Sequence, residues 1–207
     1  MQSILYYIHD PMCSWCWGYR PVWGRLQQEL PESINVQYVL GGLAPDNDQP
    51  MPQQMQDEIQ ATWRNIRIKL GAEFNFDFWT NNIPRRSTYI ACRAVIVARD
   101  QGLEKEMIDV IQNAYYLRAM NPSERDVLLQ LAAELSAQGM DQGRFALELE
   151  SEQNELELHR EIDLADSLTQ HGFPSLVLEW DGGRQFIKHD YLDHRDTLDR
   201  INDLLGR

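Results

Sequence analysis

Hydrophobic and polar residues form two strand-like stretches near the start of the chain, with a helical pattern between them. SILYYIHD at 3–10 and INVQYVLGG at 34–42 are rich in β-branched and aromatic residues, so both are predicted strands. From Trp17 to Leu30 apolar residues recur every three or four positions, which predicts a helix. Pro21 within it predicts a kink or a break in the first turn. Together the three elements form a predicted βαβ unit.

Helical periodicity dominates the middle of the chain. A loop rich in proline and asparagine at 44–54 precedes a helix that ends at Gly71, and a loop rich in aromatic residues follows at 74–84. Further helices are predicted near residues 86–100, 104–119, 123–138 and 141–170.

The strand pattern then returns near the end of the chain. A strand at 173–180 is joined by the turn DGG to a partner at 184–190, and an amphipathic helix follows. The element order is therefore βαβ, a helical block, then ββα, which predicts an α/β protein with a small mixed sheet. Residues 1–44 and 171–207 are predicted to form one domain, into which residues 45–170 are inserted as an α-helical domain.

Composition and charge narrow the class of protein. The chain has 32 acidic and 19 basic residues, a net charge of −13, which disfavours nucleic acid as a partner. No apolar stretch has the length of a membrane helix, and strand-like sequence follows Met1 without a basic leader or a signal-length apolar run. We therefore expect a cytoplasmic protein that does not act at a membrane. Three cysteines in 207 residues do not make a secreted disulfide framework.

Cys13 and Cys16 lie in the motif DPMCSWCWG at 10–18, between the first predicted strand and helix. A structural disulfide is the weakest interpretation, because so short a loop removes little chain entropy. A zinc half-site lacks a second ligand pair, since there is no other Cys-x-x-Cys and the five histidines are scattered. A redox pair explains the placement best. The unpaired N–H groups of the helix start stabilise a Cys13 thiolate, and Cys16 can resolve a mixed disulfide on Cys13.

The motif at 10–18, the helical insertion and the segment GFPSLVL at 172–178 resemble the DsbA family of the thioredoxin-like superfamily. The closest resemblance is to its leaderless cytoplasmic branch, near the FrnE-like, predicted protein-disulfide isomerases. It implies a thioredoxin-like fold (βαβ plus ββα) with a large α-helical insertion. It also implies that Pro174 is cis and shapes a substrate cleft beside Cys13 and Cys16, and that the Phe173 backbone pairs with an extended peptide.

The residues around the cysteine pair qualify this resemblance. Ser14 and Trp15 stand where strongly oxidising members have Pro-His, so we expect a less stabilised thiolate and a less oxidising couple, with both residues at the substrate surface. Relatives often have a buried acid near the pair, and His9 or Asp10 could shuttle protons for Cys16. A hydrogen-bonded His9 and a solvated Asp10 are the alternatives.

Cys92 lies in the apolar helix STYIACRAVIVA, so a buried, inert thiol is expected there. A third redox thiol is the alternative interpretation of this position.

The sequence thus predicts a thiol–disulfide oxidoreductase or isomerase that acts on protein or small-molecule disulfides and thiols. No organic cofactor or metal is expected, and glutathione is the candidate reductant. The first alternative is a glutathione-dependent isomerase or transferase of the 2-hydroxychromene-2-carboxylate isomerase type, which generally lacks a resolving cysteine such as Cys16. The second is a non-enzymatic redox-sensing binding module whose cysteines signal oxidation.

Overall fold

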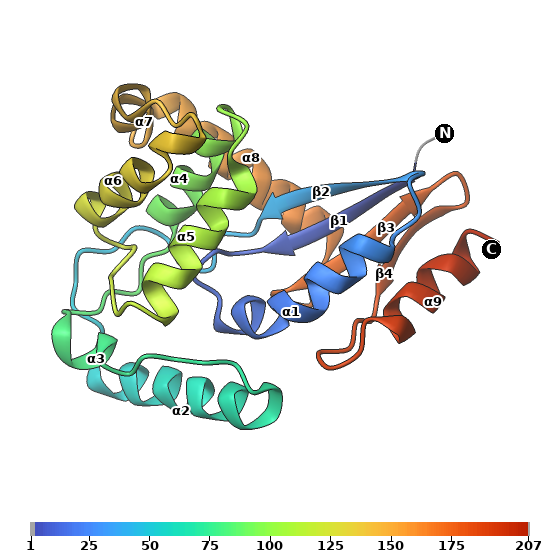
Figure 1. Cartoon of the computed structure of the whole chain (residues 1–207), viewed down its shortest axis with the longest axis horizontal. Coiled ribbons are helices and arrows are strands. Elements are labelled where there is room, and N and C mark those ends of the chain that lie inside the picture. The colour runs from blue at the N-terminus through green and yellow to red at the C-terminus, as the bar shows by residue number, and fades with distance from the viewer. Residues whose placement is uncertain (1–2, 207) are drawn as a thin grey trace.

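A four-stranded mixed sheet organises the molecule in the computed structural model, which describes residues 3–206 (Figure 1). Its strands are β1 (Ser3–His9), β2 (Ile34–Leu40), β3 (Ser175–Trp180) and β4 (Gly183–Ile187), in the order β2-β1-β3-β4. β2 is parallel to β1, whereas β3 is antiparallel to both β1 and β4. The predicted α/β thioredoxin-like arrangement, βαβ followed by ββα, is confirmed.

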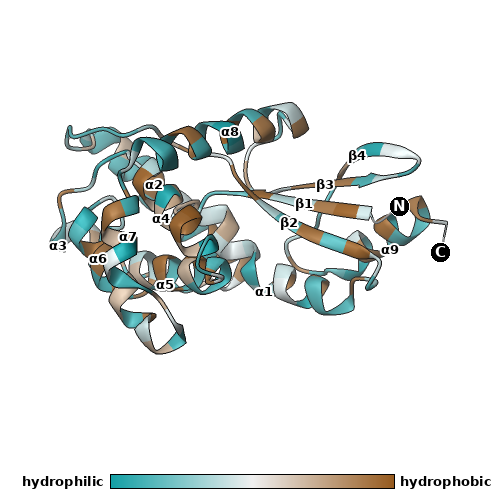
Figure 2. Cartoon of the chain, turned by 90° about the horizontal axis from the view of Figure 1, so that it is seen from above, coloured by the Kyte–Doolittle hydropathy of each residue, from teal (hydrophilic) through white to brown (hydrophobic). Residues whose placement is uncertain are grey.

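Helices cover both faces of this sheet. Figure 2 shows α8 (Glu152–Leu168) on one face, and α1 (Ser14–Glu29) and α9 (Arg195–Leu204) on the other. Alternate side chains of a strand point to opposite faces. In β1, Leu5 and Tyr7 accordingly pack with α1 and α9, while Tyr6 and Ile8 pack with α8. β1 is thus buried on both faces, and its carboxyl end leads directly to the cysteine motif.

The remaining helices lie beyond the carboxyl ends of β1 and β2 (Figure 1). Trp63, fully buried, is at the centre of their aromatic core, where it stacks on Phe74 with ring centroids 5.0 Å apart. The remaining helices are α2 (Gln53–Leu70), α3 (Phe78–Asn81), α4 (Tyr89–Arg99), α5 (Glu104–Tyr116), α6 (Arg125–Glu134) with the 3₁₀ turn Ser136–Gln138, and α7 (Gln142–Glu148). The division of the chain into a thioredoxin-like domain and an inserted helical domain stays a prediction.

Several boundaries differ from the sequence prediction. The helix predicted at 141–170 is two helices, because the Asn154 amide donates to the carbonyl oxygens of Glu148 and Leu149 (3.2 and 3.1 Å) and Ser151 caps α8. The predicted aromatic loop contains the short helix α3. α1 continues through Pro21 without a break.

Within residues 3–206, no helix combines the length and apolar character that crossing a bilayer requires.

Candidate active site

Cys13 stands at the junction between β1 and α1. It is the N-cap of α1, with extended backbone angles (φ −80°, ψ 118°), and it is 6% exposed. A hydrogen bond from the Cys16 thiol lowers the pKa of Cys13, and the backbone N–H groups of Cys16 and Trp15 lower it further. Burial and the nearby Asp10 carboxylate oppose this shift. The Cys16 thiol and, after it, the start of the helix therefore favour the Cys13 thiolate.

Cys16 has the opposite character. It is 1% exposed, and burial raises its pKa well above the usual value, as does its hydrogen bond to Cys13. Neither thiol is in a disulfide in this structure. The surroundings thus favour a thiolate at Cys13 and a protonated thiol at Cys16, which donates a hydrogen bond to it.

The segment that joins α8 to β3 also reaches Cys13. The Phe173–Pro174 peptide bond is cis, and the Cys13 thiol donates to the Phe173 carbonyl oxygen at 3.7 Å. The ring of Phe173 covers Gly41, where a β-carbon would lie 2.0 Å from the ring. Phe173 and Pro174 are therefore next to the cysteine pair, while their roles toward a substrate stay predictions.

Asp10 is a buried carboxylate, not a solvated loop residue. It is 0% exposed, and Oδ1 accepts from the Met12 backbone N–H at 2.7 Å. Oδ2 accepts from the Leu43 N–H (2.7 Å), the Thr88 hydroxyl (2.7 Å) and the Cys92 thiol (3.5 Å). Burial raises the pKa of Asp10 although these bonds lower it, and its charge acts on both Cys13 and Cys16. A proton acceptor of raised pKa thus lies close to the pair.

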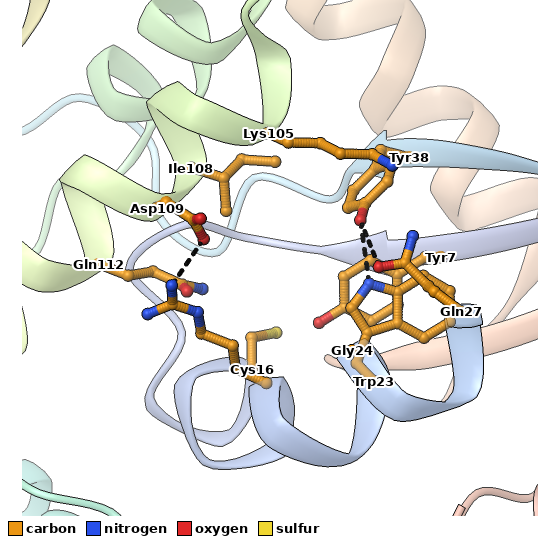
Figure 3. A pocket seen from close by; sticks show the side chains of 11 residues that line it. Tyr7, Cys16, Trp23, Gly24, Gln27, Tyr38, Lys105, Ile108, Asp109 and Gln112 are labelled. Carbon is orange, nitrogen blue, oxygen red and sulfur yellow. Dashed lines mark hydrogen bonds and ion pairs between the residues drawn. The ribbon is translucent and has the colours of Figure 1, made fainter. Parts of the chain in front are cut away.

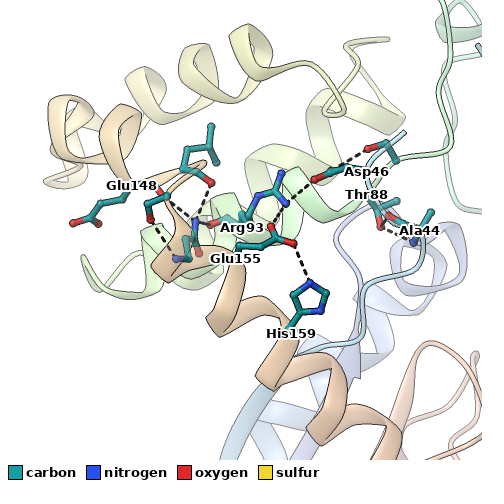
Figure 4. Close-up of polar contacts among 11 residues, drawn as sticks. Ala44, Asp46, Thr88, Arg93, Glu148, Glu155 and His159 are labelled. Carbon is teal, nitrogen blue, oxygen red and sulfur yellow. Dashed lines mark hydrogen bonds and ion pairs between the residues drawn. The ribbon is translucent and has the colours of Figure 1, made fainter. Parts of the chain in front are cut away.

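The loop after β2 is fixed in place by polar contacts with α4 and α8 (Figure 4). Arg93, 5% exposed, donates to Asp46 at 2.7 Å and pairs with Glu155. Thr88 accepts from the Ala44 N–H at 3.1 Å. These contacts hold the part of the loop whose amide reaches the Asp10 carboxylate, so the helical segment positions a group of the redox site.

His9 is fully buried at the end of β1. Within residues 3–206 neither ring nitrogen has a hydrogen-bond partner, and the ring stacks on Tyr7 with centroids 5.1 Å apart. Burial, with a smaller effect of Arg99, lowers the pKa of His9 to about 3. Its assignment as a proton shuttle stays a prediction.

Burial of His9 should make folding stability depend on pH. The unfolded chain protonates this histidine below about pH 6.5, whereas the folded chain keeps it neutral to about pH 3. Protonation of His9 therefore has little effect on the free energy of unfolding above pH 6.5 and lowers it as the pH falls below that value. Between 6.5 and about pH 5 the loss is about 2 kcal/mol. His9→Phe should make this slope in urea unfolding shallower, with the remainder due to His189, whose pKa burial also lowers, while the exposed-site control His171→Gln should keep it. An unchanged slope in His9→Phe contradicts this prediction.

Tyr191 lies against Trp15 of the cysteine motif, although the sequence did not indicate it. Trp15 and Ser14 are half-buried, and Trp15 meets Tyr191 edge to face, with centroids 5.2 Å apart. Tyr191 comes from the loop after β4, and no motif marks it. Cys92 is buried, as expected for a structural thiol, and burial raises its pKa well above the usual value. Within residues 3–206, no three His, Cys, Asp or Glu side chains are placed to hold a metal ion.

A thioredoxin-type sheet, with two cysteines at the start of the first helix and a cis-proline segment opposite them, defines the thiol–disulfide oxidoreductases of the thioredoxin superfamily. Residues 6–199 match the model of the DSBA-like thioredoxin domain. The chain belongs to this DsbA-like family.

Solved structures and a curated protein are similar to the chain. A candidate protein disulfide isomerase of Nitrosomonas europaea is 27% identical, with a TM-score of 0.84, over 100% of this chain and 98% of that one. The cytosolic disulfide reductase DsbM of Pseudomonas aeruginosa is 26% identical, with a TM-score of 0.77, over 98% of each chain. The ClpXP adapter protein SpxH of Halalkalibacterium halodurans is 23% identical over 153 residues, 71% of this chain. The chain spans about half (49%) of that protein's length.

Proposed function

We propose that this DsbA-like enzyme reduces or isomerises disulfides in the cytoplasm, with Cys13 as the nucleophile and Cys16 as the resolving cysteine. The opposite character of the two buried thiols carries the proposal. The hydrogen bond from the Cys16 thiol, together with the backbone N–H groups of the helix start, lowers the pKa of Cys13, whereas burial raises that of Cys16. A thiolate is the attacking form in disulfide exchange. The protonated Cys16 therefore does not attack until a mixed disulfide has formed on Cys13.

The proposed exchange has two steps. The Cys13 thiolate attacks one sulfur of a substrate disulfide and forms a mixed disulfide, and the other substrate sulfur leaves as a thiolate that takes a proton from solvent. Cys16 then loses its proton, attacks the Cys13 sulfur and releases the second substrate thiolate. The substrate gains two electrons, and Cys13 and Cys16 become a disulfide.

Asp10 is the group best placed to accept the Cys16 proton. Its carboxylate is fully buried, its pKa is raised, and its charge acts on Cys16. A base of raised pKa takes a proton from a neighbouring thiol more readily than an ordinary surface carboxylate does. This assignment takes Asp10, rather than His9, as the proton shuttle.

The substrate side of the site consists of Phe173, Pro174, Trp15 and Ser14. The Phe173 carbonyl faces the Cys13 sulfur at 3.7 Å, so a peptide laid along this segment has its disulfide beside the nucleophile. Glutathione is the proposed electron donor that reduces the pair again. DsbM of Pseudomonas aeruginosa has been solved with GSH, which supports this choice.

A redox titration tests the proposed function. The protein is equilibrated in glutathione buffers of graded ratio, quenched with acid, and mapped by mass spectrometry. We expect one reversible two-electron transition that joins Cys13 to Cys16 and leaves Cys92 free. A pair that stays reduced at every ratio contradicts the proposal. Oxidation without turnover of a model peptide disulfide would favour the redox-sensing module instead.

A further inference from the structure

The two oxygens of the buried Asp10 carboxylate have different numbers of donors. Oδ2 accepts from the Leu43 N–H and the Thr88 hydroxyl, each at 2.7 Å, and from the Cys92 thiol at 3.5 Å. Within the described part of the chain Oδ1 has one donor, the Met12 N–H at 2.7 Å. A carboxylate offers about two lone-pair sites on each oxygen. The sites of Oδ2 are therefore filled, whereas Oδ1 keeps one for a proton.

Thr88 stands at the N-cap of α4 but does not cap that helix. A threonine at this position usually accepts from a backbone N–H of the first turn. Among the described residues the Thr88 side chain makes no such bond, although it is only 3% exposed. Its hydroxyl instead donates to Asp10 and accepts from the Ala44 N–H at 3.1 Å (Figure 4). A buried hydroxyl that bonds a distant carboxylate in place of its own helix indicates a role at the redox site.

The Thr88 hydroxyl has a second acceptor within reach. The Ala44 carbonyl oxygen lies 3.4 Å from it, against 2.7 Å for Oδ2 of Asp10. A hydroxyl hydrogen rotates to suit its acceptors, so it can point to Oδ2 while Asp10 is charged and turn to Ala44 when Asp10 is neutral. Charge-assisted hydrogen bonds are about twice as strong as neutral ones. Thr88 therefore stabilises the carboxylate more than the carboxylic acid.

Neutral donors, and no cation, set the charge state of Asp10. Within residues 3–206 the carboxylate forms no ion pair with a lysine, arginine or histidine. Burial raises the pKa of Asp10 and its hydrogen bonds lower it, with Thr88 the larger of the two side-chain donors. The titratable groups on which its charge acts come from three helices: Cys13 and Cys16 of α1, Cys92 of α4, and Tyr115 and Tyr116 of α5.

A second carboxylate lies on another side of Cys16. Cys16 lines a pocket of about 230 Å³ between α1, β2 and α5, and Asp109 is an acid in its wall (Figure 3). Burial raises the pKa of Asp109, but its ion pair with Arg20 at 3.0 Å opposes this. A paired carboxylate is the weaker base. Asp10 is therefore the stronger candidate for the Cys16 proton, and Asp109 is the competitor that a test must separate from it.

We propose that Thr88 is a positioning residue for the resolving step, and that its hydroxyl holds Oδ2 of Asp10 so that Oδ1 takes the proton of Cys16. The inference rests on the proposed function, because it needs Cys16 to attack a mixed disulfide. The Cys16 S–H bond breaks, an O–H bond forms at Oδ1, and the Cys16 thiolate attacks the Cys13 sulfur. The substrate leaves as a thiolate that takes a proton from solvent. When glutathione later attacks Cys13 of the oxidised pair, Cys16 leaves as a thiolate and takes the proton back from Asp10.

The pKa of Asp10 in Thr88 variants tests the positioning role. Aspartate carboxyl carbons are labelled with ¹³C in a Cys13→Ser background, and the Asp10 signal, assigned with Asp10→Asn, is followed by NMR across pH. Thr88→Val keeps the shape of the side chain but removes the donor, so it should raise the pKa of Asp10 by about 1 to 2. Thr88→Ser should restore the original pKa. Thr197→Val, at a fully buried threonine of α9, is the control and should leave it unchanged.

The pH dependence of the resolving step gives the functional readout. Reduced protein is mixed with excess peptide disulfide and quenched with acid at graded times, and intact mass follows the mixed disulfide on Cys13. In Thr88→Val the rate at which this adduct disappears should rise at a pH higher by about 1 to 2 than in the wild type. A merely structural role of Thr88 would lower the rate at every pH and leave the profile in place.

Three outcomes decide the matter. An unchanged pKa of Asp10 in folded Thr88→Val overturns the inference, and Thr88→Ala takes its place if the valine variant does not fold. A pH profile that moves in Asp109→Asn but not in Thr88→Val also overturns it, because the proton then leaves through the pocket. A wild-type pair that forms no disulfide in glutathione buffers refutes the proposed function itself, whatever the pKa of Asp10.

Discussion

Replacing Cys13 by serine should lower kcat/KM for a peptide disulfide by a factor on the order of 10³ or more, the scale of loss seen when a nucleophile is removed. A serine hydroxyl stays protonated in the place where Cys13 is held toward the thiolate form by Cys16 and the helix start. Cys16→Ser should behave differently, because the nucleophile remains. It should accumulate a mixed disulfide with the substrate on Cys13, since no neighbouring thiol releases it.

Stopped-flow turnover of a model peptide disulfide and intact-mass analysis after acid quench measure the two effects. Cys92→Ala removes the third thiol and should still form the substrate adduct on Cys13, although it also removes a hydrogen bond to the Asp10 carboxylate (3.5 Å). Substantial turnover in Cys13→Ser, or a substrate adduct on Cys92, contradicts the assignment of the nucleophile.

Gly41→Ala should lower the rate with peptide disulfides by up to about 10²-fold, since a displacement of about 1 Å in a positioning group can have an effect of that size. A β-carbon at Gly41 would lie 2.0 Å from the Phe173 ring, far inside van der Waals contact, so the ring must move. The carbonyl of the same residue faces the Cys13 sulfur. Displacement of the ring therefore disturbs the surface on which a peptide lies, while both thiols stay at the helix start.

Comparison of peptide reduction with alkylation of Cys13 by iodoacetamide separates these effects. Alkylation should change little in Gly41→Ala, because the small reagent does not need the peptide surface. Gly24→Ala is the matched control, since nothing lies within 4 Å of a β-carbon at that glycine of α1. An equal loss in both reactions would mean that Gly41 acts on the thiol itself and not through Phe173.

The fold could be predicted where local pattern and final burial agree. β1 and β3 are apolar stretches buried on both faces, and the cysteine motif marks the start of α1. The helical segment was predicted less well because tertiary contacts set its boundaries. α4 begins at Tyr89 rather than near residue 86, since the backbone N–H of Thr88 donates to the Ala44 carbonyl at 2.9 Å.

In the candidate site, too, some features could be predicted from the sequence and others could not. The two cysteines are close in sequence, so their pairing could be predicted from spacing, and Phe173–Pro174 followed from a family resemblance. Thr88 and Gln112 could not be predicted. A threonine before a helix and a glutamine within one are ordinary in sequence. Only packing brings Thr88 to Asp10 and places Gln112 in the wall of a pocket that Cys16 also lines.

The donors to the Asp10 carboxylate belong to two different parts of the chain. Met12 and Leu43 lie near the first two strands, whereas Thr88 and Cys92 lie in the helical segment. A chimaera that kept the whole motif but took its insertion from another family member would therefore inherit a different hydrogen-bonding shell around the acid. Evolution can in this way diversify the electron-transfer behaviour of such enzymes through the insertion, while the cysteine motif stays constant.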